Sequence, residues 1–472
     1  MSRAHIIGAG MAGLSAAIEL ARAGYRVALA DGAAQAGGRC RSYHDPQLGR
    51  VIDNGNHLVL SGNDAVMAYL RTIGAEDRLA GPDETRFEFV DAGGLYATPP
   101  RPGRAVPTPI RHPGEGRDPA SSSPDQARTE QGSWAPAFAG GTGKEGPPAN
   151  LPRWTFRPNP LRIPTWILSR NRRLPGTSPL DYLRFGGLLR ATPSDTLSDR
   201  VPMDGPVWSH LLDPVFVSAL NTQSHEASAL LAAAIVKGSL LRGGKASMPR
   251  IAHPTLAATF IDPALDWLNV KGARLDTGRR LRAIGFDGDN VTHLDFADGR
   301  IEVAPGEPVV LAVPAWVAAD LVPGLTTPTE FRAIVNAHFA FTPPPGTAPM
   351  IGVVGGMTEW IFAFEDRLSV TVSAADDLID ADREALARAF WAEISAIHGL
   401  PAELPPWQIV KEKRATFAAT PEQDARRPGT ATRWRNLFLA GDWTQTGLPA
   451  TIEGAIRSGV TAAGLAQAAR LV

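Results

Sequence analysis

The feature that most constrains the fold of this chain is a glycine-rich turn between a strand and a helix near the N-terminus. An apolar strand, residues 4–7, runs into Gly8-Ala-Gly-Met-Ala-Gly13, and a helix-like run with apolar residues on one side follows as far as Gly24. A second strand-like run ends at Asp31. The first glycine of such a βαβ unit permits the tight turn, the second lets the backbone approach a pyrophosphate, and the third lets the helix pack on the strand. The residues predicted to hold a dinucleotide here are Gly8, Gly10, Ala12, Gly13 and Asp31.

The acid at the end of the second strand narrows the choice of nucleotide. A carboxylate at Asp31 can accept the ribose hydroxyls of an adenosine and would repel a 2′-phosphate. The N-terminus of the preceding helix offers free N–H groups and the positive end of a dipole to the phosphates. The pattern therefore predicts FAD or NAD and argues against NADP.

Composition excludes several classes of protein. A chain of 472 residues is too long for one compact core and suggests two or more domains. A net charge of −1 with 20% charged residues gives no electrostatic case for nucleic acid. Cys40 is the sole cysteine, so no internal disulfide can form; we expect a reducing, cytoplasmic setting and a small filler role for its side chain. We also expect no cleavable signal peptide, and no apolar run approaches the length of about 20 residues that spans a bilayer.

Separated strands suggest that one nucleotide domain is assembled from three stretches of chain. Residues 308–314 and 436–442 both read as buried parallel strands, the second ending in a glycine turn. We predict an α/β fold, with a Rossmann-like FAD-binding domain of the glutathione reductase/amine oxidase type and an inserted α+β substrate domain. The predicted FAD-binding domain comprises residues 1–80, 245–325 and 430–472. The predicted substrate domain comprises residues 81–244 and 326–429.

Residues 101–150 differ in kind from the rest. This segment holds nine prolines, eight glycines and four serines, and it has almost no apolar periodicity, so we expect it to be disordered. Its phrases resemble translated interspersed bacterial repeats, which suggests a neutral genomic insertion. The flanking residues 94–97 and 153–158 would join as strand-like sequence without it.

Two further regions offer groups that suit a flavin dinucleotide. Gly37-Gly38-Arg39 follows Asp31 by six residues and can present backbone N–H groups and a guanidinium to the diphosphate. The loop that follows places Gly55, Asn56 and His57 near the same cofactor. Near the other end, a strand, Gly441-Asp442, a loop and a helix would set Asp442 at a ribityl hydroxyl, and the N–H groups of Thr451 and Ile452 at the pyrimidine end of the ring. A buried capping acid before an ordinary amphipathic helix would explain this last motif equally well.

The order and spacing of these three motifs resemble the flavin amine oxidase and phytoene desaturase superfamily. Within it, residues 53–57, 154–159, 219–222, 248–250 and 441–453 look most like hydroxysqualene dehydroxylases, also called squalene-associated FAD-dependent desaturases. The resemblance implies FAD as cofactor, since a second anchoring region so far along the chain suits a flavin. It implies that hydroxysqualene and reduced flavin give squalene, water and oxidised flavin, which would feed hopanoid or sterol synthesis.

The resemblance also bears on individual residues. This superfamily usually contacts adenine through a backbone peptide at the position of Leu281, although an ordinary core residue of an edge strand is the alternative. His57 and Glu226 are candidate proton donors to the leaving hydroxyl. His57 could instead hold its loop by hydrogen bonding, and Glu226 could cap a helix beginning near Ser224. No metal site is predicted.

The substrate implied is a long apolar isoprenoid. Apolar residues that could line a tunnel, or form ordinary core, lie at residues 208–220 and 229–236. Residues 164–173 mix apolar and basic side chains, which suits peripheral contact with the inner face of a bacterial cytoplasmic membrane, or a solvated basic turn. The sequence does not identify the electron donor. Two other functions stay open: a carotenoid desaturase or amine oxidase of the same superfamily, and a prenyl-lipid carrier without flavin, against which the intact glycines argue.

Overall fold

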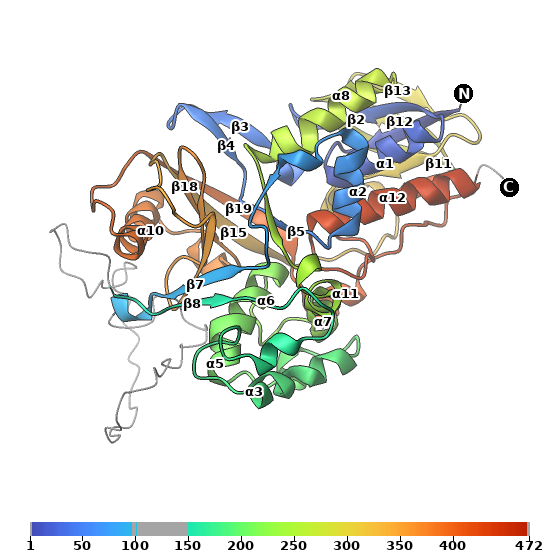
Figure 1. The fold of residues 1–472 in the computed structure, drawn as a ribbon. Helices are drawn as coiled ribbons and strands as arrows, with labels where there is room; N and C mark the ends of the chain where they lie inside the picture. The colour runs from blue at the N-terminus through green and yellow to red at the C-terminus, as the bar shows by residue number, and fades with distance from the viewer. Residues whose placement is uncertain (1, 97–100, 102–149, 470–472) are drawn as a thin grey trace.

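A five-stranded parallel sheet forms the centre of one half of the computed structural model, which describes residues 2–96, 101 and 150–469. The strand order is β10-β2-β1-β14-β20, and all neighbours pair in parallel. The bounds are β1 (Arg3–Ile7), β2 (Arg26–Ala30), β10 (Arg274–Asp276), β14 (Val309–Leu311) and β20 (Leu437–Leu439). Segments more than 400 residues apart thus lie in one sheet (Figure 1), and the strands predicted at residues 4–7, 308–314 and 436–442 are confirmed.

The first and last long helices pack directly against each other on this sheet. Helix α1 (Met11–Arg22) crosses α12 (Ile452–Ala469) where a Cβ on Gly459 would lie 2.0 Å from the Ser15 hydroxyl oxygen and 2.2 Å from the Ala12 carbonyl oxygen. Ser15 donates its hydroxyl to the Ile456 carbonyl at 3.1 Å. Only glycine at position 459 permits so close a crossing, which ties the C-terminal helix to the glycine-rich turn.

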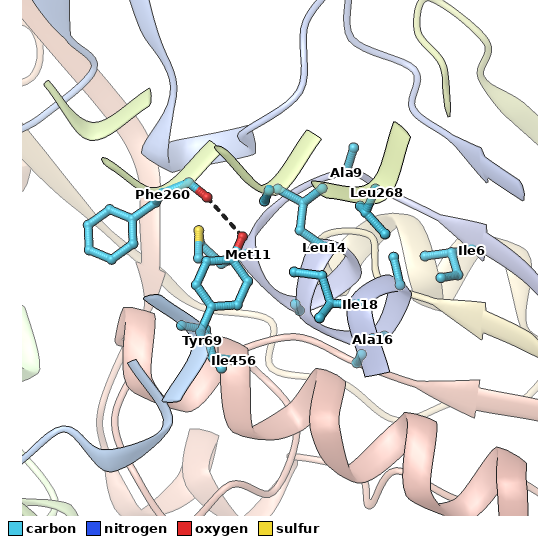
Figure 2. Packing of buried hydrophobic residues seen from close by; sticks show 14 of the residues in the cluster. Ile6, Ala9, Met11, Leu14, Ala16, Ile18, Tyr69, Phe260, Leu268 and Ile456 are labelled. Carbon is cyan, nitrogen blue, oxygen red and sulfur yellow. Dashed lines mark hydrogen bonds between the residues drawn. The ribbon is translucent and has the colours of Figure 1, made fainter. Parts of the chain in front are cut away.

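The core beneath this crossing draws side chains from four separate stretches of sequence (Figure 2). Leu14 and Ile18 of α1 meet Leu268 of α8 (Asp262–Val270) and Ile456 of α12. Tyr69 of α2 (Asp64–Ile73) is buried there, and its hydroxyl donates to the Phe260 carbonyl at 2.8 Å. Burial of such side chains is the dominant favourable contribution to folding, so the glycine-rich turn is supported by a packed core.

An antiparallel three-stranded sheet completes this half of the molecule. It consists of β11 (Leu281–Asp287), β12 (Asn290–Phe296) and β13 (Gly299–Glu302). The parallel sheet with helices packed against it agrees with the predicted Rossmann-like architecture, to which the structure adds this antiparallel sheet, and the α/β fold class is confirmed. The boundaries of the two domains stay a prediction.

A second, larger sheet lies beside the first and is mostly antiparallel. Its strand order is β19-β15-β18-β17-β16-β7-β8, with one parallel pair between β16 and β7. Helix α10 (Arg383–His398) buries Phe390, Trp391 and Ile394 in a cluster with residues of this sheet. The bounds are β7 (Phe87–Asp91), β8 (Arg153–Phe156), β15 (Phe331–Phe339), β16 (Met350–Val354), β17 (Trp360–Ala363), β18 (Leu368–Val372) and β19 (Trp407–Phe417).

The segment predicted to be an insertion lies between two paired strands. Strands β7 and β8 are antiparallel neighbours, and the Asp91 N–H donates to the Pro152 carbonyl at 2.9 Å. The strand-like flank after the segment is confirmed as β8, whereas the strand expected at residues 94–95 is wrong, because Gly93–Leu95 forms a single 3-10 turn. Disorder is also wrong for Arg101, which is buried and donates to Asp377 at 2.7 Å and to Glu359 at 3.3 Å. Asn150 is exposed and belongs to no helix or strand, and residues 102–149 of the predicted insertion lie outside the described residues.

Short helices lie next to strands β7 and β8 of the second sheet, at the bottom of Figure 1. They are α3 (Pro179–Leu183), α4 (Leu197–Arg200), α5 (Gly205–Val207), α6 (Asp213–Leu220) and α7 (Ala229–Gly238). Trp208, Phe216 and Leu220 are fully buried in one hydrophobic cluster, which agrees with a core role, and a tunnel lining stays a prediction. The remaining elements are α9 (Ala315–Leu321), α11 (Pro421–Ala425), the hairpin β3 (Ser42–Asp45) and β4 (Arg50–Asp53), and the small sheet of β5 (Leu58–Leu60), β6 (Leu79–Ala80) and β9 (Pro249–Ala252). None of the described helices has the length and apolar character needed to cross a membrane.

Candidate active site

The glycine-rich turn has the geometry that a bound pyrophosphate requires. Gly8 adopts φ +106°, and a Cβ there would lie 2.3 Å from the Ala312 carbonyl oxygen. A Cβ on Gly13 would lie 1.8 Å from the Gly8 carbonyl oxygen, so glycine at position 13 sets the approach of helix to strand. A Cβ on Gly10 would meet no described atom within 4 Å. The space in front of Gly10 is therefore open, at the N-terminus of α1, while Gly8 and Gly13 are enclosed by protein.

Asp31 organises the same turn from the end of β2. Its Oδ2 accepts the Ala9 N–H at 2.6 Å and its Oδ1 accepts the Ala33 N–H at 2.7 Å. The carboxylate therefore fixes the backbone of the glycine-rich turn, a task that the sequence did not show. Each oxygen keeps a second lone pair, and contact with ribose hydroxyls stays a prediction.

Leu281 lies close to this acid through the backbone. The Arg279 N–H donates to the Asp31 carbonyl at 2.8 Å, and Leu281 opens β11 two residues later. The Leu281 side chain is buried in a cluster with Ile7 and Ala30. The Leu281 side chain is thus an ordinary core residue, as the alternative interpretation expected. Its backbone contact with adenine stays a prediction.

The second predicted region lies directly on the first. The Gly37 N–H donates to the Ala9 carbonyl at 2.8 Å, and a Cβ on Gly38 would lie 3.4 Å from the Gly10 Cα. Both glycines have positive φ, which favours residues without a side chain. The Gly37-Gly38 turn and the glycine-rich turn together border the open space at Gly10.

Arg39 joins the second region to the third. Its Nη2 donates to Asp442 Oδ1 at 2.6 Å, and its Nη1 donates to the Ala415 carbonyl. The structure thus brings together residues 403 positions apart in sequence. The sequence assigned Arg39 to phosphate and Asp442 to a ribityl hydroxyl but did not predict this pair, which neutralises two charges beside the predicted cofactor position.

The loop after β20 is held by a buried arginine that the sequence did not single out. Arg427 donates its Nε to the Thr444 carbonyl at 2.9 Å and its Nη2 to the Asp442 carbonyl at 3.1 Å. Its ion pair with Asp424 has an N–O distance of 2.8 Å. From the other side, the Gly441 N–H donates to the Ser458 hydroxyl of α12 at 2.8 Å. These bonds fix the backbone at Asp442 before any ligand binds.

Helix α12 points its N-terminus into this region. The Thr451 hydroxyl accepts the Gly454 N–H at 3.0 Å and so caps the helix. The N–H groups of Ile452 and Glu453 belong to the first turn and precede the first helical hydrogen bond, which the Ala455 N–H makes to Thr451. The predicted placement of Thr451 and Ile452 at a helix N-terminus is confirmed, and their contact with a flavin ring stays a prediction.

The loop of residues 53–57 is anchored to the second sheet. The Asn336 amide donates to the Asn54 carbonyl at 3.4 Å, and a Cβ on Gly55 would lie 3.0 Å from that same amide nitrogen. Asn56 donates to the Thr371 hydroxyl at 3.1 Å, while its own amide oxygen is buried without a partner among the described residues. The loop is thus positioned by strands β15 and β18 and keeps one acceptor free.

His338 of β15 supports the same loop in a neutral form. It donates Nε2–H to the Asp53 carbonyl at 3.0 Å and accepts the Ser369 hydroxyl on Nδ1 at 2.8 Å. Burial lowers the pKa of His338 to about 3, and the charge of Arg367 adds to the effect. An unfolded histidine titrates near 6.5, so the unfolded chain takes up a proton below this pH while the native imidazole does not.

This difference predicts a loss of stability in acid. Between about pH 7.5 and about pH 5 we expect His338 to lower the free energy of unfolding by about 2 kcal/mol. Urea unfolding at both pH values, with the wild type beside His338→Gln, measures the contribution. The glutamine variant should lose about 2 kcal/mol less over the interval, and an equal loss in both proteins would contradict the assignment.

His57 is half-buried, and its environment disfavours a positive charge. Burial lowers its pKa to about 4, and the Arg39 guanidinium contributes in the same direction. This shift favours the neutral imidazole near pH 7, and the role of His57 as proton donor stays a prediction. Burial also raises the pKa of the neighbouring Cys40 thiol to about 12, which agrees with a filler role.

Glu226 is placed by an ion pair. Its Oε1 accepts Arg332 Nη2 at 3.0 Å, and Arg332 also faces Glu330 at 3.8 Å and Asp376 at 4.0 Å. The helix expected to begin near Ser224 is wrong: α7 begins at Ala229, and its cap is Ser228, whose hydroxyl accepts the Leu231 N–H. Glu226 therefore caps no helix.

The ion pair predicts that Glu226 acts structurally. We expect Glu226→Gln to change turnover by less than about twofold and stability by less than about 1 kcal/mol, because Arg332 keeps two other acidic neighbours. A general acid contributes about 100-fold or more. Steady-state turnover of this variant, with its urea midpoint as control, separates the two roles, and a 100-fold loss at unchanged stability would establish Glu226 as the acid.

The structure also brings in a carboxylate that sequence reasoning missed. Glu412 of β19 accepts the Asn54 amide at 3.4 Å, and its charge acts on Arg39. It lies three residues before Ala415, whose carbonyl accepts Arg39. No local motif marks Glu412, since only the pairing of β19 with β15 brings it to the loop at Asn54. Among the described residues no group of three or more His, Cys, Asp or Glu side chains is arranged to hold a metal ion.

Comparison with known proteins identifies the family. The model of the flavin-containing amine oxidoreductases matches residues 11–466. This chain belongs to that family. Hydroxysqualene dehydroxylase of Rhodopseudomonas palustris is 46% identical over 98% of both chains, and that of Zymomonas mobilis is 44% identical over 99% of both. A 15-cis-phytoene desaturase of Synechococcus elongatus is more distant, 28% identical over 34% of this chain and 38% of its own.

Solved structures show the same fold. Putrescine oxidase with bound putrescine aligns with a TM-score of 0.61 at 14% identity, covering 98% of both chains. The resemblance to the flavin amine oxidases and, within them, to the hydroxysqualene dehydroxylases is confirmed. The prediction that this chain is a flavin-dependent oxidoreductase is also confirmed.

FAD is the cofactor of this chain, and the three regions fit it. The open space at Gly10 and the first-turn N–H groups of α1 suit a diphosphate, and Asp31 lies where a ribose would bind. The N-terminus of α12 and the unpaired amide oxygen of Asn56 offer donors and an acceptor to the ring. The individual contacts stay predictions.

Proposed function

We propose that this chain removes the hydroxyl group of hydroxysqualene reductively, giving squalene and water. The observation that carries the proposal is the 46% identity over 98% of both chains with an enzyme of that name. The cofactor regions described above support it, since all three are present and in mutual contact. Bound reduced FAD supplies the two electrons. The substrate loses its carbon–oxygen bond, gains a carbon–hydrogen bond, and releases the oxygen as water after one protonation.

The protein residues have to hold the substrate dry and place its hydroxyl at the flavin. An allylic carbon–oxygen bond ionises more readily when its oxygen is polarised, and exclusion of water protects the resulting cation from competing reactions. His57 belongs to the loop predicted to lie near the flavin, and its environment favours the neutral imidazole, so we propose that it polarises the oxygen by donating a hydrogen bond. The buried clusters around Trp208 and Phe216 would exclude water.

Anaerobic single turnover tests the proposal. Enzyme with FAD is photoreduced, mixed with hydroxysqualene dispersed in detergent, and extracted for product analysis while the flavin absorbance is followed. We expect one squalene per flavin and recovery of the oxidised spectrum. A spectrum that stays reduced with no squalene formed would overturn the proposal; oxidised enzyme with phytoene is the parallel assay for a desaturase.

The setting of the reaction is also part of the proposal. Cys40 is the sole cysteine and is a buried free thiol, which suits a reducing compartment, so we propose a cytoplasmic location. The squalene formed there would be available for hopanoid or sterol synthesis.

A further inference from the structure

Exposed apolar side chains are concentrated in one part of the molecule. Eleven large apolar residues are exposed in the described chain, and six of them fall within residues 161–189. Ile163, Leu168 and Leu180 are 72%, 69% and 70% exposed. The full set, with one neighbour from a later turn, is Leu161, Ile163, Leu168, Leu180, Leu183, Leu189 and Leu241, which we call the leucine face. Scattered single residues of this kind are common on protein surfaces, but such a cluster marks an interaction site.

Buried contacts join the segments that carry the leucine face. Asn159 donates its amide to the Ile163 carbonyl at 2.9 Å and accepts the Trp166 N–H at 3.1 Å, which folds residues 159–166 into a compact turn. The ring of buried Trp166 meets Tyr182 of α3 edge-on at 5.0 Å. Leu180 and Leu183 are three residues apart on α3, so they share one side of that helix.

The remaining member is joined from a later turn. The Gly244 N–H donates to the Asn159 carbonyl at 2.9 Å, and a Cβ on Gly243 would lie 2.7 Å from the Leu161 carbonyl carbon. The turn that carries Leu241 therefore packs against the segment that carries Leu161, and together with α3 they form one packed unit. This unit forms the end of the molecule around α3 and α5, opposite α8 and β13 (Figure 1).

The same segment carries a local excess of positive charge. Residues 151–190 contain eight arginines and a single acidic residue, Asp181, in a chain whose net charge is −1. Arg162, Arg170 and Arg190 are exposed, and none of them makes an ion pair with an acidic side chain of the described residues. Arg162 stands between Leu161 and Ile163, so charge and apolar surface are interleaved.

We propose that the leucine face and its arginines dock this protein on the surface of an anionic lipid bilayer, as a peripheral contact. Docking on a membrane rests on the proposed function in one respect, because the C30 hydrocarbon substrate of that function resides in a membrane. Apolar side chains that enter the acyl boundary, bordered by arginines that meet anionic headgroups, are the combination that holds amphipathic surfaces on membranes. A second copy of the chain is the other occupant to consider, but exposed arginines would face arginines across a twofold contact.

Vesicle flotation with the full-length FAD-bound protein tests the docking. Vesicles of phosphatidylcholine and phosphatidylglycerol in equal parts should carry the protein, and vesicles of phosphatidylcholine alone should carry at least about tenfold less. We expect Ile163→Asp with Leu168→Asp, and separately Arg162→Gln with Arg170→Gln, to weaken binding to the anionic vesicles by about tenfold or more. Val270→Asp is the matched control, because Val270 is 83% exposed at the end of α8 and should bind as wild type.

Three results would overturn the docking. They are absence of wild-type binding to anionic vesicles, equal binding by the double variants, and a dimer in light scattering that the Ile163→Asp and Leu168→Asp changes dissociate without any vesicle binding. Flavin absorbance of each variant verifies that it is folded. Flotation uses no substrate, so it stands apart from squalene formation in detergent, where the double variants should turn over as wild type.

Discussion

Alanine at Gly10 will leave the protein folded but deprive it of FAD, whereas alanine at Gly13 will destabilise the protein itself. A Cβ at position 10 meets no described atom within 4 Å, and the backbone there has φ −79°, which any residue adopts. The new methyl group would occupy the space in front of the α1 N-terminus where the pyrophosphate approaches. We expect the FAD affinity of Gly10→Ala to fall by about 100-fold, while the unfolding free energy of the apoprotein changes by less than about 0.5 kcal/mol.

Gly13→Ala should behave in the opposite way. Its Cβ would lie 1.8 Å from the Gly8 carbonyl oxygen, a backbone atom that cannot turn aside, so α1 would have to move off β1. Overpacking of this kind costs about 1–3 kcal/mol and sometimes more, and here it would appear in the apoprotein as well as in the holoprotein.

Thermal unfolding of the apoproteins and FAD titration by fluorescence quenching measure both quantities. Gly464→Ala, at an exposed helical position with no described atom within 4 Å, is the matched control. It should leave the FAD affinity unchanged and stabilise the apoprotein by about 0.5–1 kcal/mol, because alanine has the higher helix propensity. Loss of apoprotein stability in Gly10→Ala comparable to that of Gly13→Ala would show that Gly10 is needed for packing, and would contradict its assignment to the cofactor.

The difference between these two glycines illustrates how far the sequence could predict the fold. The spacing of Gly8, Gly10 and Gly13 with Asp31 is local, and a local pattern can be assigned to a βαβ unit because its geometry is set by neighbouring residues. The strands at residues 308–314 and 436–442 were predictable for the same reason, since buried parallel strands are short apolar runs.

Contacts between residues far apart in the chain could not be predicted from the sequence. The acceptor of Arg39 lies 403 residues away, and the partner of Glu226 comes from β15. A charged residue in isolation shows that it needs a partner, but the partner is set by the sheet pairing. The prediction of Glu226 as a helix cap failed because a serine and a glutamate near an apolar run resemble a helix start, while the chain stays in turns until Ser228.

The solvent exposure of apolar side chains was equally hard to predict from the sequence. Leu180 and Leu183 have the spacing of buried helix positions, yet both are exposed, because α3 is five residues long and uses Tyr182 for its inward contact. Periodicity predicts which residues share a face, and it does not say whether that face meets protein or a membrane.

Glu453 links the last helix to the second one, and its loss should be among the most damaging single changes in the chain. The carboxylate is buried, and it accepts the Ala65 N–H at 3.2 Å and the Val66 N–H at 2.9 Å from the first turn of α2. The cap residue of α2 itself, Asn63, makes no capping bond with its side chain. Glu453 therefore caps α2 from 387 residues away and places a negative charge at the positive end of that helix.

Glu453→Ala would leave one buried and one part-buried N–H group without an acceptor, which costs about 2–4 kcal/mol of unfolding free energy. Glu453→Gln keeps one amide oxygen as an acceptor, so it should lose about half as much. Urea unfolding gives the totals, and hydrogen exchange of residues 64–73 should show faster opening of α2 in the alanine variant. Glu384→Ala removes an exposed glutamate whose partner Arg388 is also exposed, and it should cost less than about 0.5 kcal/mol.

FAD binding should weaken together with stability in Glu453→Ala, because Glu453 adjoins Thr451 and Ile452 at the N-terminus that is predicted to face the cofactor. An alanine variant as stable as Glu384→Ala, with unchanged exchange in α2, would mean that water replaces the carboxylate as the acceptor. If the predicted losses appear, Glu453 acts by holding α2 and α12 together. Glu453 would then affect the flavin only indirectly, by fixing the position of α12. The N–H groups at the start of α12 would make the direct contact.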